Sequence, residues 1–505
     1  MLIECVPNFS EGRNRDVIDA ITGEIRAVEG VLLLDVDPGA ATNRTVVTFL
    51  GPPDAVEEAA FRAIRKAAAL IDMSKHSGEH ARMGATDVCP FVPVQGATME
   101  DCVAISRRLG KRVGDELGIP VYLYEHAATR PDRRSLADIR KGEYEALPNK
   151  LQDPEFAPDF GPAEFLPRTG ATVIGGREFL IAYNVNLNTR DKKLAKKVAL
   201  EIREKGKIKR DANGKAVRDE SGATVWQPGR FKEVRGVGWY IEEFGRAQVS
   251  FNLTNYKVSS VHDVFDACCE EAAKLGLRVT GSELVGLIPL DAVVAAGDHY
   301  LTRHGGTTGV SVREKIHSAV LSLGLDELGA FDPDAKILEL LYRGQPPLAS
   351  MTLSEFADEL SSDSVAPGGG SVAALCGALS AALSAMVATL TWSKKGMESA
   401  RPAMKRIGDR GQSLKDFFLQ SVDRDTDAFN AVIAAMRLPK KTGAEVAARD
   451  AAIERANQRA AEVPLEVVER SLEALEIALE AAGEGNPNSV SDVGVAGTCA
   501  LAAAE

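Results

Sequence analysis

The sequence predicts a chain in two parts: an α/β (α+β) region of two subdomains with helices packed on mixed sheets, followed by an all-α helical region. Two observations predict this division. Over the first two thirds of the 505 residues, short apolar runs typical of strands alternate with apolar residues at helical spacing. From Thr352 onward the composition changes to alanine-rich segments, which favour helix. A content of 45% apolar and 26% charged residues is typical of a globular protein of two or three domains.

The first elements follow from local patterns. Apolar residues recur at helical spacing over residues 17–28, and the run 31–34 predicts a buried strand. A second strand is expected over residues 45–49. Asp54, with a glutamate three residues later, resembles an N-cap with its capping-box partner, so we expect a helix from there to about Ile71.

A similar order returns further along the chain. A strand at residues 247–253 precedes a helix at about 261–275, which indicates two α/β subdomains of related layout joined near 175–179. Between them, residues 190–210 carry ten Lys or Arg against three acids, a local charge of +7, and the turn-forming residues 211–222 then predict an inserted hairpin. The basic segment is either a solvated helix face or a patch that attracts an anionic tail such as oligoglutamate.

The helical region is expected to begin after a linker at Pro346-Pro347, and Thr352 with Glu355 forms a capping box for its first helix. Small residues over 371–388 allow helices to approach closely. The run Gly368–Gly370 is either a flexible connection or a helix N-terminus whose amides face an anion or a carbonyl.

Bulk properties exclude several classes of partner. The net charge of −12 argues against nucleic acid. Seven cysteines without C-x-x-C spacing fit a reducing compartment. We expect a cytoplasmic protein without membrane association, because the N-terminus lacks a signal pattern and no segment approaches the roughly 18 uninterrupted apolar residues of a membrane span.

The segment His76-Ser-Gly-Glu79-His80 is the most informative in the chain, since it places two of only seven histidines beside a carboxylate. It fits the H-x-x-E-H pattern of a zinc hydrolase built on His76, Glu79 and His80, and it also fits a general base in a loop. Gly78 and Gly84 disfavour the helix that paired zinc ligands require, so we expect a loop without metal. Structural histidines remain a further alternative.

Many short motifs, in order, resemble the formimidoyltransferase–cyclodeaminase family over nearly the whole chain. The matching segments are residues 3–14, 34–45, 78–91 (GEHARMGATDVCPF), 161–170, 179–186, 236–240, 281–287, 366–374 and 436–440. The resemblance implies a formiminotransferase N-terminal subdomain at 1–178, its C-terminal subdomain at 179–335, a linker at 336–350 and a helical cyclodeaminase domain at 351–505.

The resemblance also implies a chemistry. Members transfer a formimidoyl group between N-formimidoyl-L-glutamate and N5 of tetrahydrofolate in histidine breakdown, with tetrahydrofolate as co-substrate and small molecules as partners; a homo-oligomer is expected. His80 matches the family's proposed catalytic histidine. A nearby carboxylate would orient its ring, and Asp37 and Glu79 are candidates. Asn8, Asn43 and Arg44 would hold the carboxylates of glutamate. The stretch that matches the family's folate-binding residues is Gly161, Pro162, Ala163, Glu164, Phe165, Leu166, Pro167, Arg168, Thr169 and Gly170.

The second domain of the family closes a ring with loss of ammonia, giving 5,10-methenyltetrahydrofolate. Asp425 aligns with the family's catalytic aspartate, and Asp423 and Asp427 are its rivals. The cyclodeaminase loop comprises Gly368, Gly369, Gly370 and Ser371. The chain ends where members continue with further helix, so the transferase is the firmer expectation, and a folate-binding protein with an inactive second domain is the alternative.

Overall fold

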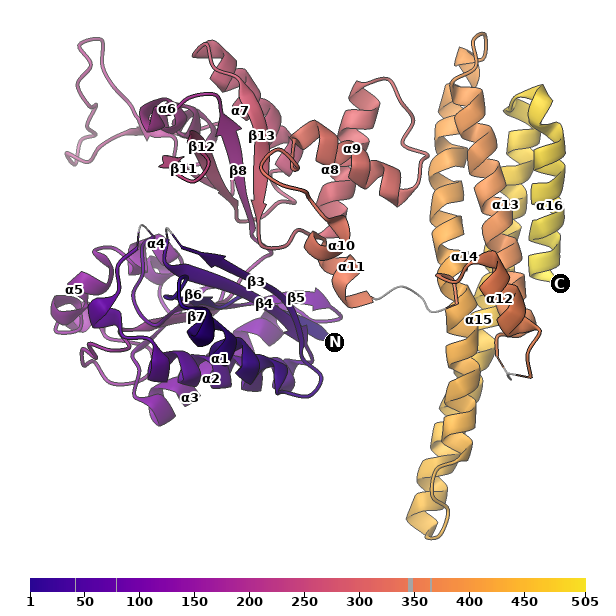
Figure 1. Ribbon diagram of the computed structural model, residues 1–505, viewed down its shortest axis with the longest axis horizontal. Coiled ribbons are helices and arrows are strands. Elements are labelled where there is room, and N and C mark those ends of the chain that lie inside the picture. The colour runs from indigo at the N-terminus through magenta and orange to yellow at the C-terminus, as the bar shows by residue number, and fades with distance from the viewer. Residues whose placement is uncertain (41, 79, 344–347, 364–365) are drawn as a thin grey trace. The chain divides into compact units, whose positions relative to one another are not determined.

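The computed structural model describes residues 1–505 except 41, 79, 344–347 and 364–365 (Figure 1). The chain forms two compact units, the first made of residues 1–292 and 323–342 and the second of 293–322 and 343–505. The expected linker at Pro346-Pro347 lies outside the described residues. An α/β region followed by a helical region confirms the fold class.

The first sheet of the first unit is mixed. Its strands are β1 (Leu2–Cys5), β2 (Asn8–Phe9), β3 (Leu32–Gly39), β4 (Arg44–Gly51), β5 (Thr86–Gln95), β6 (Val121–Glu125) and β7 (Thr172–Gly176). β7 pairs in parallel with β5 and β6, and the other pairs are antiparallel. Helices α1 (Arg15–Arg26), α2 (Pro53–Leu70) and α3 (Met99–Leu117) lie along one face, where Phe49, Phe61 and Phe91 are buried (Figure 1).

The other face of this sheet carries the candidate polar residues. Asn8 and Asp37 are both paired with Val46 of β4, and Arg44 lies two residues from Val46 on the same strand. Side chains two apart on a strand point to the same side, and so do paired side chains. Asn8, Asp37 and Arg44 therefore share the face opposite the helices.

Two local predictions were wrong. β3 pairs with β4 at one edge of the sheet, so its first residue, Leu32, is 51% exposed rather than buried. The helix expected to start at Asp54 begins at Pro53 with Pro52 as N-cap, because proline already fixes the backbone angle that the first helical turn requires. Thr352, by contrast, forms the expected capping box with Glu355.

The second sheet is antiparallel and has four strands, in the order β11 (Val234–Ile241), β12 (Arg246–Leu253), β8 (Ile181–Leu187) and β13 (Val279–Val285). Helices α6 (Lys192–Ile202) and α7 (Val261–Lys274) pack on one face (Figure 1). The two sheets thus share the expected layout in one respect, because each has helices packed on one face. They differ in the number of strands and in how the strands pair.

The opposite face of the second sheet holds a buried polar network. Asn184 donates to Glu283, and Gln248 donates to both Glu283 and Asn186, at 2.8–3.0 Å. Asn186 and Gln248 are fully buried. Each buried amide is thus satisfied within the sheet, which fixes the register of the central strands.

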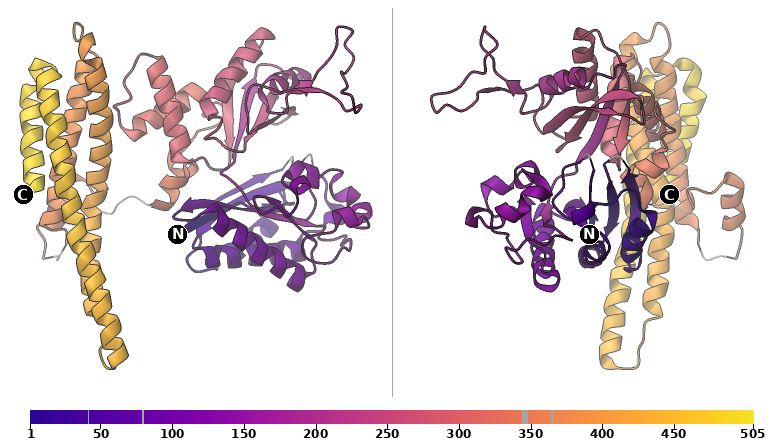
Figure 2. Two further views of the ribbon diagram at one scale, coloured as in Figure 1. Left: turned by 180° about the vertical axis from the view of Figure 1, so that it is seen from behind. Right: turned by 60° about the vertical axis from the view of Figure 1, so that its left-hand side comes forward.

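An arm projects from the second sheet between α6 and β11 (Figure 2). It starts and ends with β9 (Lys207–Ile208) and β10 (Trp226–Gln227), which pair with each other in a separate two-stranded sheet. Its two turns are closed by the carboxylates of Asp211 and Asp219, each accepting from nearby backbone N–H groups. The expected inserted hairpin is confirmed.

The second unit is helical. It contains most of α8 (Leu290–Arg303) and of α9 (Val312–Leu323). It also contains the whole of α12 (Leu353–Leu360), α13 (Gly369–Trp392), α14 (Arg401–Met436), α15 (Gly443–Glu484) and α16 (Val490–Ala504). Buried small residues of α13 let α14 approach closely; a Cβ on Gly377 would come within 2.6 Å of the Phe418 ring. α14 and α15 run side by side beyond the ends of the other helices (Figure 2).

Among the described helices, α13 is long and apolar enough, by length and composition, to cross a membrane. Its apolar character comes largely from alanine, and half of the relevant window is buried in the helical unit, as in the core helix of a bundle. The length and composition of this one helix are therefore weak evidence for a membrane span.

Candidate active sites

The His76–His80 segment is a loop, as predicted. The short helical turn Met73–Lys75 ends before His76, and the next regular element is β5. Gly78 in the segment and Gly84 just after it are in close contact with other backbone: a Cβ on Gly78 would lie 2.2 Å from the Thr42 oxygen, and one on Gly84 would lie 2.3 Å from the Ala171 oxygen. The loop is thus packed against two neighbouring segments.

His76 braces this loop. Its Nε2 donates to the Asn43 carbonyl at 2.9 Å, and its Nδ1 accepts from Arg82 Nε at 3.3 Å. Arg82 is in turn held by ion pairs with Glu143 and Glu145. Both ring nitrogens of His76 are occupied, so the side chain offers no lone pair to a zinc ion without losing these bonds.

His80 is held differently. Its Nδ1 donates to the Ala81 carbonyl at 2.7 Å, which places the ring proton on Nδ1 and the lone pair on Nε2. Among the described residues none forms a hydrogen bond to Nε2. Nη1 of Arg44 lies 3.3 Å from Nδ1. The imidazole is therefore oriented as a base, next to a cation that would repel a metal ion.

A buried carboxylate connects Arg44 to a second arginine. Asp87 Oδ2 accepts from Arg44 Nη1 at 2.5 Å and also from Arg140 Nη2, while Asp87 Oδ1 accepts from the Met83 N–H at 2.9 Å. Asp87 is fully buried, and the side chains of Arg44 and Arg140 are 10% and 12% exposed. The cluster has two cations and one anion.

The electrostatics of this cluster set the state of His80. Arg44 first, then burial and Arg140, lower the pKa of His80 to about 4, so the ring is neutral at neutral pH. Burial raises the pKa of Asp87, but the two guanidiniums outweigh it and hold this pKa below its usual value. Burial lowers the pKa of Arg44 to about 10, which still leaves it charged.

The two asparagines position other groups. Asn8 accepts from Arg44 Nε at 2.9 Å and donates to the Val6 carbonyl. Asn43 accepts from the Gly12 N–H and donates to the Ser77 carbonyl, both at 3.0 Å, with its backbone in the left-handed region at φ 49°. These bonds show that Asn8 positions Arg44 and that Asn43 connects two loops; their expected role in holding the substrate stays a prediction.

Of the two expected supporting carboxylates, Asp37 belongs to the described part of the chain. Glu79 lies outside the described residues. Asp37 shares the sheet face of Arg44, but among the described residues it forms no hydrogen bond to His80. Among the described residues, Asp87 is a carboxylate whose negative charge acts on His80, where it raises the pKa against the larger opposite effect of Arg44.

The segment expected to bind folate, residues 161–170, is a largely exposed loop whose end joins the histidine loop. The Ala85 N–H donates to the Thr169 carbonyl at 2.8 Å, and a Cβ on Gly170 would lie 2.1 Å from the Met83 oxygen. Arg168 donates to the Ala69 carbonyl at 3.3 Å. A ligand held by this loop would therefore lie close to the segment that carries His80.

The helical unit brings together Asp425 and the Gly368–Ser371 loop. α13 begins at Gly369 with Gly368 as N-cap and no capping side chain. Ser371 Oγ donates to the Val422 carbonyl at 2.9 Å and lies 3.3 Å from Asp425 Oδ2. A Cβ on Gly370 would lie 2.2 Å from Asp425 Oδ1, so the carboxylate packs against the helix start.

The geometry separates Asp425 from its two rivals. The Asp423 carboxylate accepts the backbone N–H groups of Leu348 and Ala349, at 2.8 and 3.2 Å, and so fixes the chain entering the helical unit. Asp427 is exposed. Of the three acids on this turn of α14, Asp425 is the one that faces the glycine loop.

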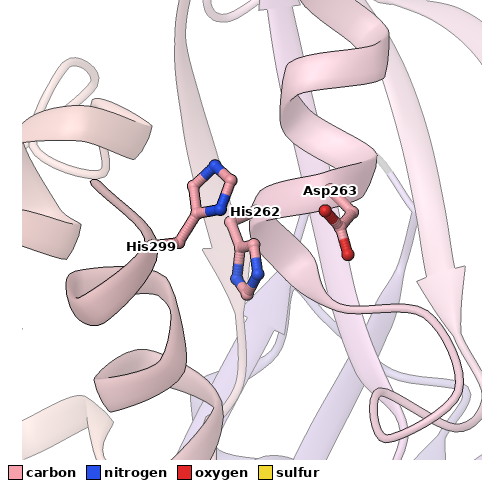
Figure 3. Close-up of side chains that lie close together, drawn as sticks. All are labelled: His262, Asp263 and His299. Atoms are coloured by element: carbon pink, nitrogen blue, oxygen red, sulfur yellow. The ribbon is translucent and has the colours of Figure 1, made fainter. Parts of the chain in front are cut away.

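Figure 3 shows a further group of possible metal ligands, His262 and Asp263 on α7 and His299 on α8. The first two residues belong to the first unit and His299 to the second. Ligands from parts whose relative placement is not fixed do not define a coordination geometry, so no metal site is assigned to them.

Sequence reasoning missed Asp87 and Arg140. Asp87 lies inside the motif quoted for the histidine loop, and its position directly before the apolar run that begins at Val88 was a local signal of a buried, paired carboxylate. Arg140 follows the short helix α4 (Leu136–Ile139), 53 residues from Asp87, and no local pattern marks it.

Three family models match the chain. They are described as "Formiminotransferase domain, N-terminal subdomain" at residues 2–177, "Formiminotransferase domain" at 182–343, and "Formiminotransferase-cyclodeaminase" at 352–505.

Curated relatives cover both parts. The chain is 45% identical to a formimidoyltransferase-cyclodeaminase of Mus musculus over 498 residues, which is 98% of this chain and 89% of the relative. It is 41% identical to a glutamate formimidoyltransferase of Streptococcus pyogenes over 59% of this chain and 93% of that protein. A methenyltetrahydrofolate cyclohydrolase of Methylorubrum extorquens is 39% identical over 29% of this chain and 70% of its own length.

Proposed function

The chain belongs to the formimidoyltransferase–cyclodeaminase family, and on this basis we propose how its two units divide two successive reactions on tetrahydrofolate. The enzyme transfers a formimidoyl group from N-formimidoyl-L-glutamate to N5 of tetrahydrofolate. It then cyclises 5-formimidoyltetrahydrofolate to 5,10-methenyltetrahydrofolate and releases ammonia. The first reaction is assigned to the unit that carries His80 and the second to the unit that carries Asp425.

In the transfer, N5 attacks the imidoyl carbon and forms a tetrahedral carbon that bears three nitrogens. His80 Nε2 takes the proton that N5 loses and then gives it to the glutamate nitrogen, after which the bond from carbon to that nitrogen breaks. The Nδ1 bond to the Ala81 carbonyl keeps the ring in the tautomer that this step needs. Arg44 binds a carboxylate of the amino acid and keeps it beside the base.

In the cyclisation, N10 attacks the carbon of the protonated imidoyl group, –CH=NH2⁺, and the departing nitrogen needs one further proton to leave as ammonia. Asp425 is placed to accept the proton from N10 and to deliver it to that nitrogen. The Ser371 hydroxyl lies 3.3 Å from this carboxylate, and the start of α13 packs against it at Gly370. The Gly368–Ser371 loop thus forms one wall of the second site.

The observation that carries the proposal is the orientation of His80, with its proton fixed on Nδ1 and Nε2 available beside two buried arginines. The test is an assay with tetrahydrofolate and N-formimidoyl-L-glutamate that follows glutamate, ammonia and methenyl-folate absorbance separately. Glutamate release reports the first reaction, and ammonia with absorbance reports the second. Absence of all three products with folded protein would contradict the proposal.

We further propose a homo-oligomer that works in the cytoplasm, without nucleic acid, membrane or a metal cofactor. Oligomer formation is supported by large apolar side chains exposed on α15, among them Leu465 at 59% and Leu479 at 77%. A reducing compartment is supported by the seven free cysteines. Light scattering measures the oligomer, and full activity after dialysis against a chelator tests the metal assignment.

A further inference from the structure

The cluster of Arg44, Asp87 and Arg140 is incomplete as a set of charges. Each arginine is nearly buried, and both share one oxygen of a single fully buried aspartate. Among the described residues no second carboxylate pairs with either guanidinium. One positive charge is therefore left without a counter-ion where desolvation makes an unpaired charge costly.

Arg140 also has an unused donor. Its Nε is buried and has no hydrogen-bond partner among the described groups. Nη2 donates to Asp87, so the guanidinium is held in place while the adjacent edge keeps its hydrogen-bonding capacity. A buried donor of this kind costs about 1–3 kcal/mol when unsatisfied, so an acceptor bound there would be stabilised.

Three described residues that contact or act on the arginines carry no charge near pH 7. Asn8 on β2 is neutral and bonds to Arg44. Tyr124 on β6 interacts with both arginines, and burial raises its pKa to about 12, so it is also neutral near pH 7. His80 is neutral as well. The missing partner is an anion with oxygen acceptors.

We propose that Arg140 and Arg44 together form a subsite for one carboxylate of the amino-acid substrate. This subsite rests on the proposed function. It adds Arg140 to the substrate-binding residues and makes the basicity of His80 depend on bound substrate. Two guanidiniums fixed by one aspartate present several N–H donors to a planar carboxylate. A bound carboxylate supplies the second negative charge and fills the open donor of Arg140.

Filling the subsite also acts on His80. The charge of Arg44, burial and the charge of Arg140 disfavour the imidazolium, and Arg44 Nη1 lies 3.3 Å from Nδ1. A carboxylate bound to the arginines offsets that charge, so the ring can accept a proton once the amino acid is present. The base thus becomes stronger when its substrate binds.

The first experiment is an NMR titration of the imidazole signals in protein labelled at histidine, with His80 identified by comparison with His80→Gln. L-Glutamate, the product of the first reaction, is the probe. Saturating glutamate is expected to raise the pKa of His80 by about one unit or more from its low value. L-Glutamine, which lacks the side-chain carboxylate, tells which carboxylate binds. An unchanged His80 pKa in the presence of bound glutamate would overturn the inference.

The second experiment compares two buried arginines. Arg140→Met removes the subsite charge and should raise KM for N-formimidoyl-L-glutamate by roughly 10–100-fold, with KM for tetrahydrofolate changed by less than about 3-fold. Arg140→Lys should lie in between. Arg133→Met is the matched control, because Arg133 is also buried, pairs with Asp159 at 2.9 Å and is not in contact with His80.

The outcomes distinguish the inference from the function. Equal increases in both KM values, or the same increase in Arg133→Met, would overturn the subsite. If Arg140→Met does not fold, Arg140→Lys and the titration of the wild-type protein still decide the question. If the wild-type protein binds glutamate and shifts His80 but transfers no formimidoyl group, the subsite stands and the proposed function fails.

Discussion

His80 and His76 lie four residues apart in one loop, yet their hydrogen bonds give them different tasks. His80→Ala should lower formimidoyl transfer by roughly 10²–10⁴-fold, the usual loss when a general base is removed. His76→Ala should be milder and should act through the loop, because His76 connects Asn43 and Arg82. Equal losses at both positions, restored by added zinc, would support the zinc site instead. Initial rates and thermal unfolding of both variants decide between them.

The low pKa of His80 makes the fold sensitive to acid. In the folded protein this pKa is about 4, against the usual 6.5, so as pH falls the unfolded chain binds this proton first. Stability from this residue is therefore intact above about pH 6.5 and is lost progressively toward pH 4. Between about pH 7.5 and pH 5 the melting temperature of the wild type should fall more than that of His80→Gln. Parallel curves would show that the ring is not held neutral.

The histidine and Arg44 could be found from the sequence because their motif is local and the residue types carry the chemistry. Arg140 could not, since its importance arises from one ion pair with Asp87 across 53 positions of sequence. Asn8 and Asn43 were predicted as substrate-binding residues, and only the structure shows that they also bond to Arg44 and to the loop backbone.

The start of α13 and α14 are in contact through the carboxylate of Asp425, which we propose as the catalytic acid of the cyclisation. Asp425→Asn should stop formation of methenyl-folate while leaving glutamate release intact. Asp427→Asn is the matched control, since it removes the same charge from an exposed position two residues further along α14. Asp423→Asn should lower the melting temperature, because an amide cannot accept both backbone N–H groups. Loss of cyclisation in Asp427→Asn but not in Asp425→Asn would show that the wrong acid was assigned.

The glycines of the same loop allow a test that leaves every acid in place. A methyl group on Gly370 would collide with the Asp425 carboxylate at 2.2 Å, whereas nothing lies within 4 Å of a Cβ on Gly369. Gly370→Ala should therefore reduce ammonia release strongly, by roughly 10²-fold or more. Gly369→Ala should retain it. Circular dichroism checks that both variants keep their helices, and equal activity in the two variants would contradict the packing described here.

Helices with strong local signals were predicted well, and the exceptions have physical causes. The capping box of Thr352 and Glu355 depends on a motif of only four consecutive residues, and it is present as predicted. β3 has the composition of a buried strand, but its exposure depends on having one neighbour in the sheet, which no local pattern records. Asp54 has the right residue type for an N-cap, and the adjacent prolines start the helix first.

The basic segment 190–210 is expected to attract the anionic polyglutamate tail of the folate substrate. In α6 the buried residues Ala195, Val198 and Ile202 occupy one face, so the lysines can be changed without disturbing the core. Lys193→Glu with Lys197→Glu should raise KM for polyglutamylated folate more than for monoglutamate, and more at low salt. The same double reversal at Lys440 and Lys441, exposed in the second unit, is the control. Identical responses of both folates would make the segment a solvated surface.

The order of elements and the change to helix at residue 352 were predictable, because they depend on composition and period over long windows. The grouping of residues 293–322 with the helical unit was not, since it arises from contacts far apart in sequence. Thr308, for example, bonds to Asp409 and Lys405 of α14.

The arm between β9 and β10 is a suitable place to insert additional sequence. Its strands pair with each other and its turns at Asp211 and Asp219 are exposed, so neither principal sheet depends on continuous chain at the turn tips. Exposed turns with small polar residues are where chains best tolerate cuts and added sequence. An affinity tag or a fluorescent label inserted at Asn213-Gly214 would thus report on the transferase unit in an intact, working chain.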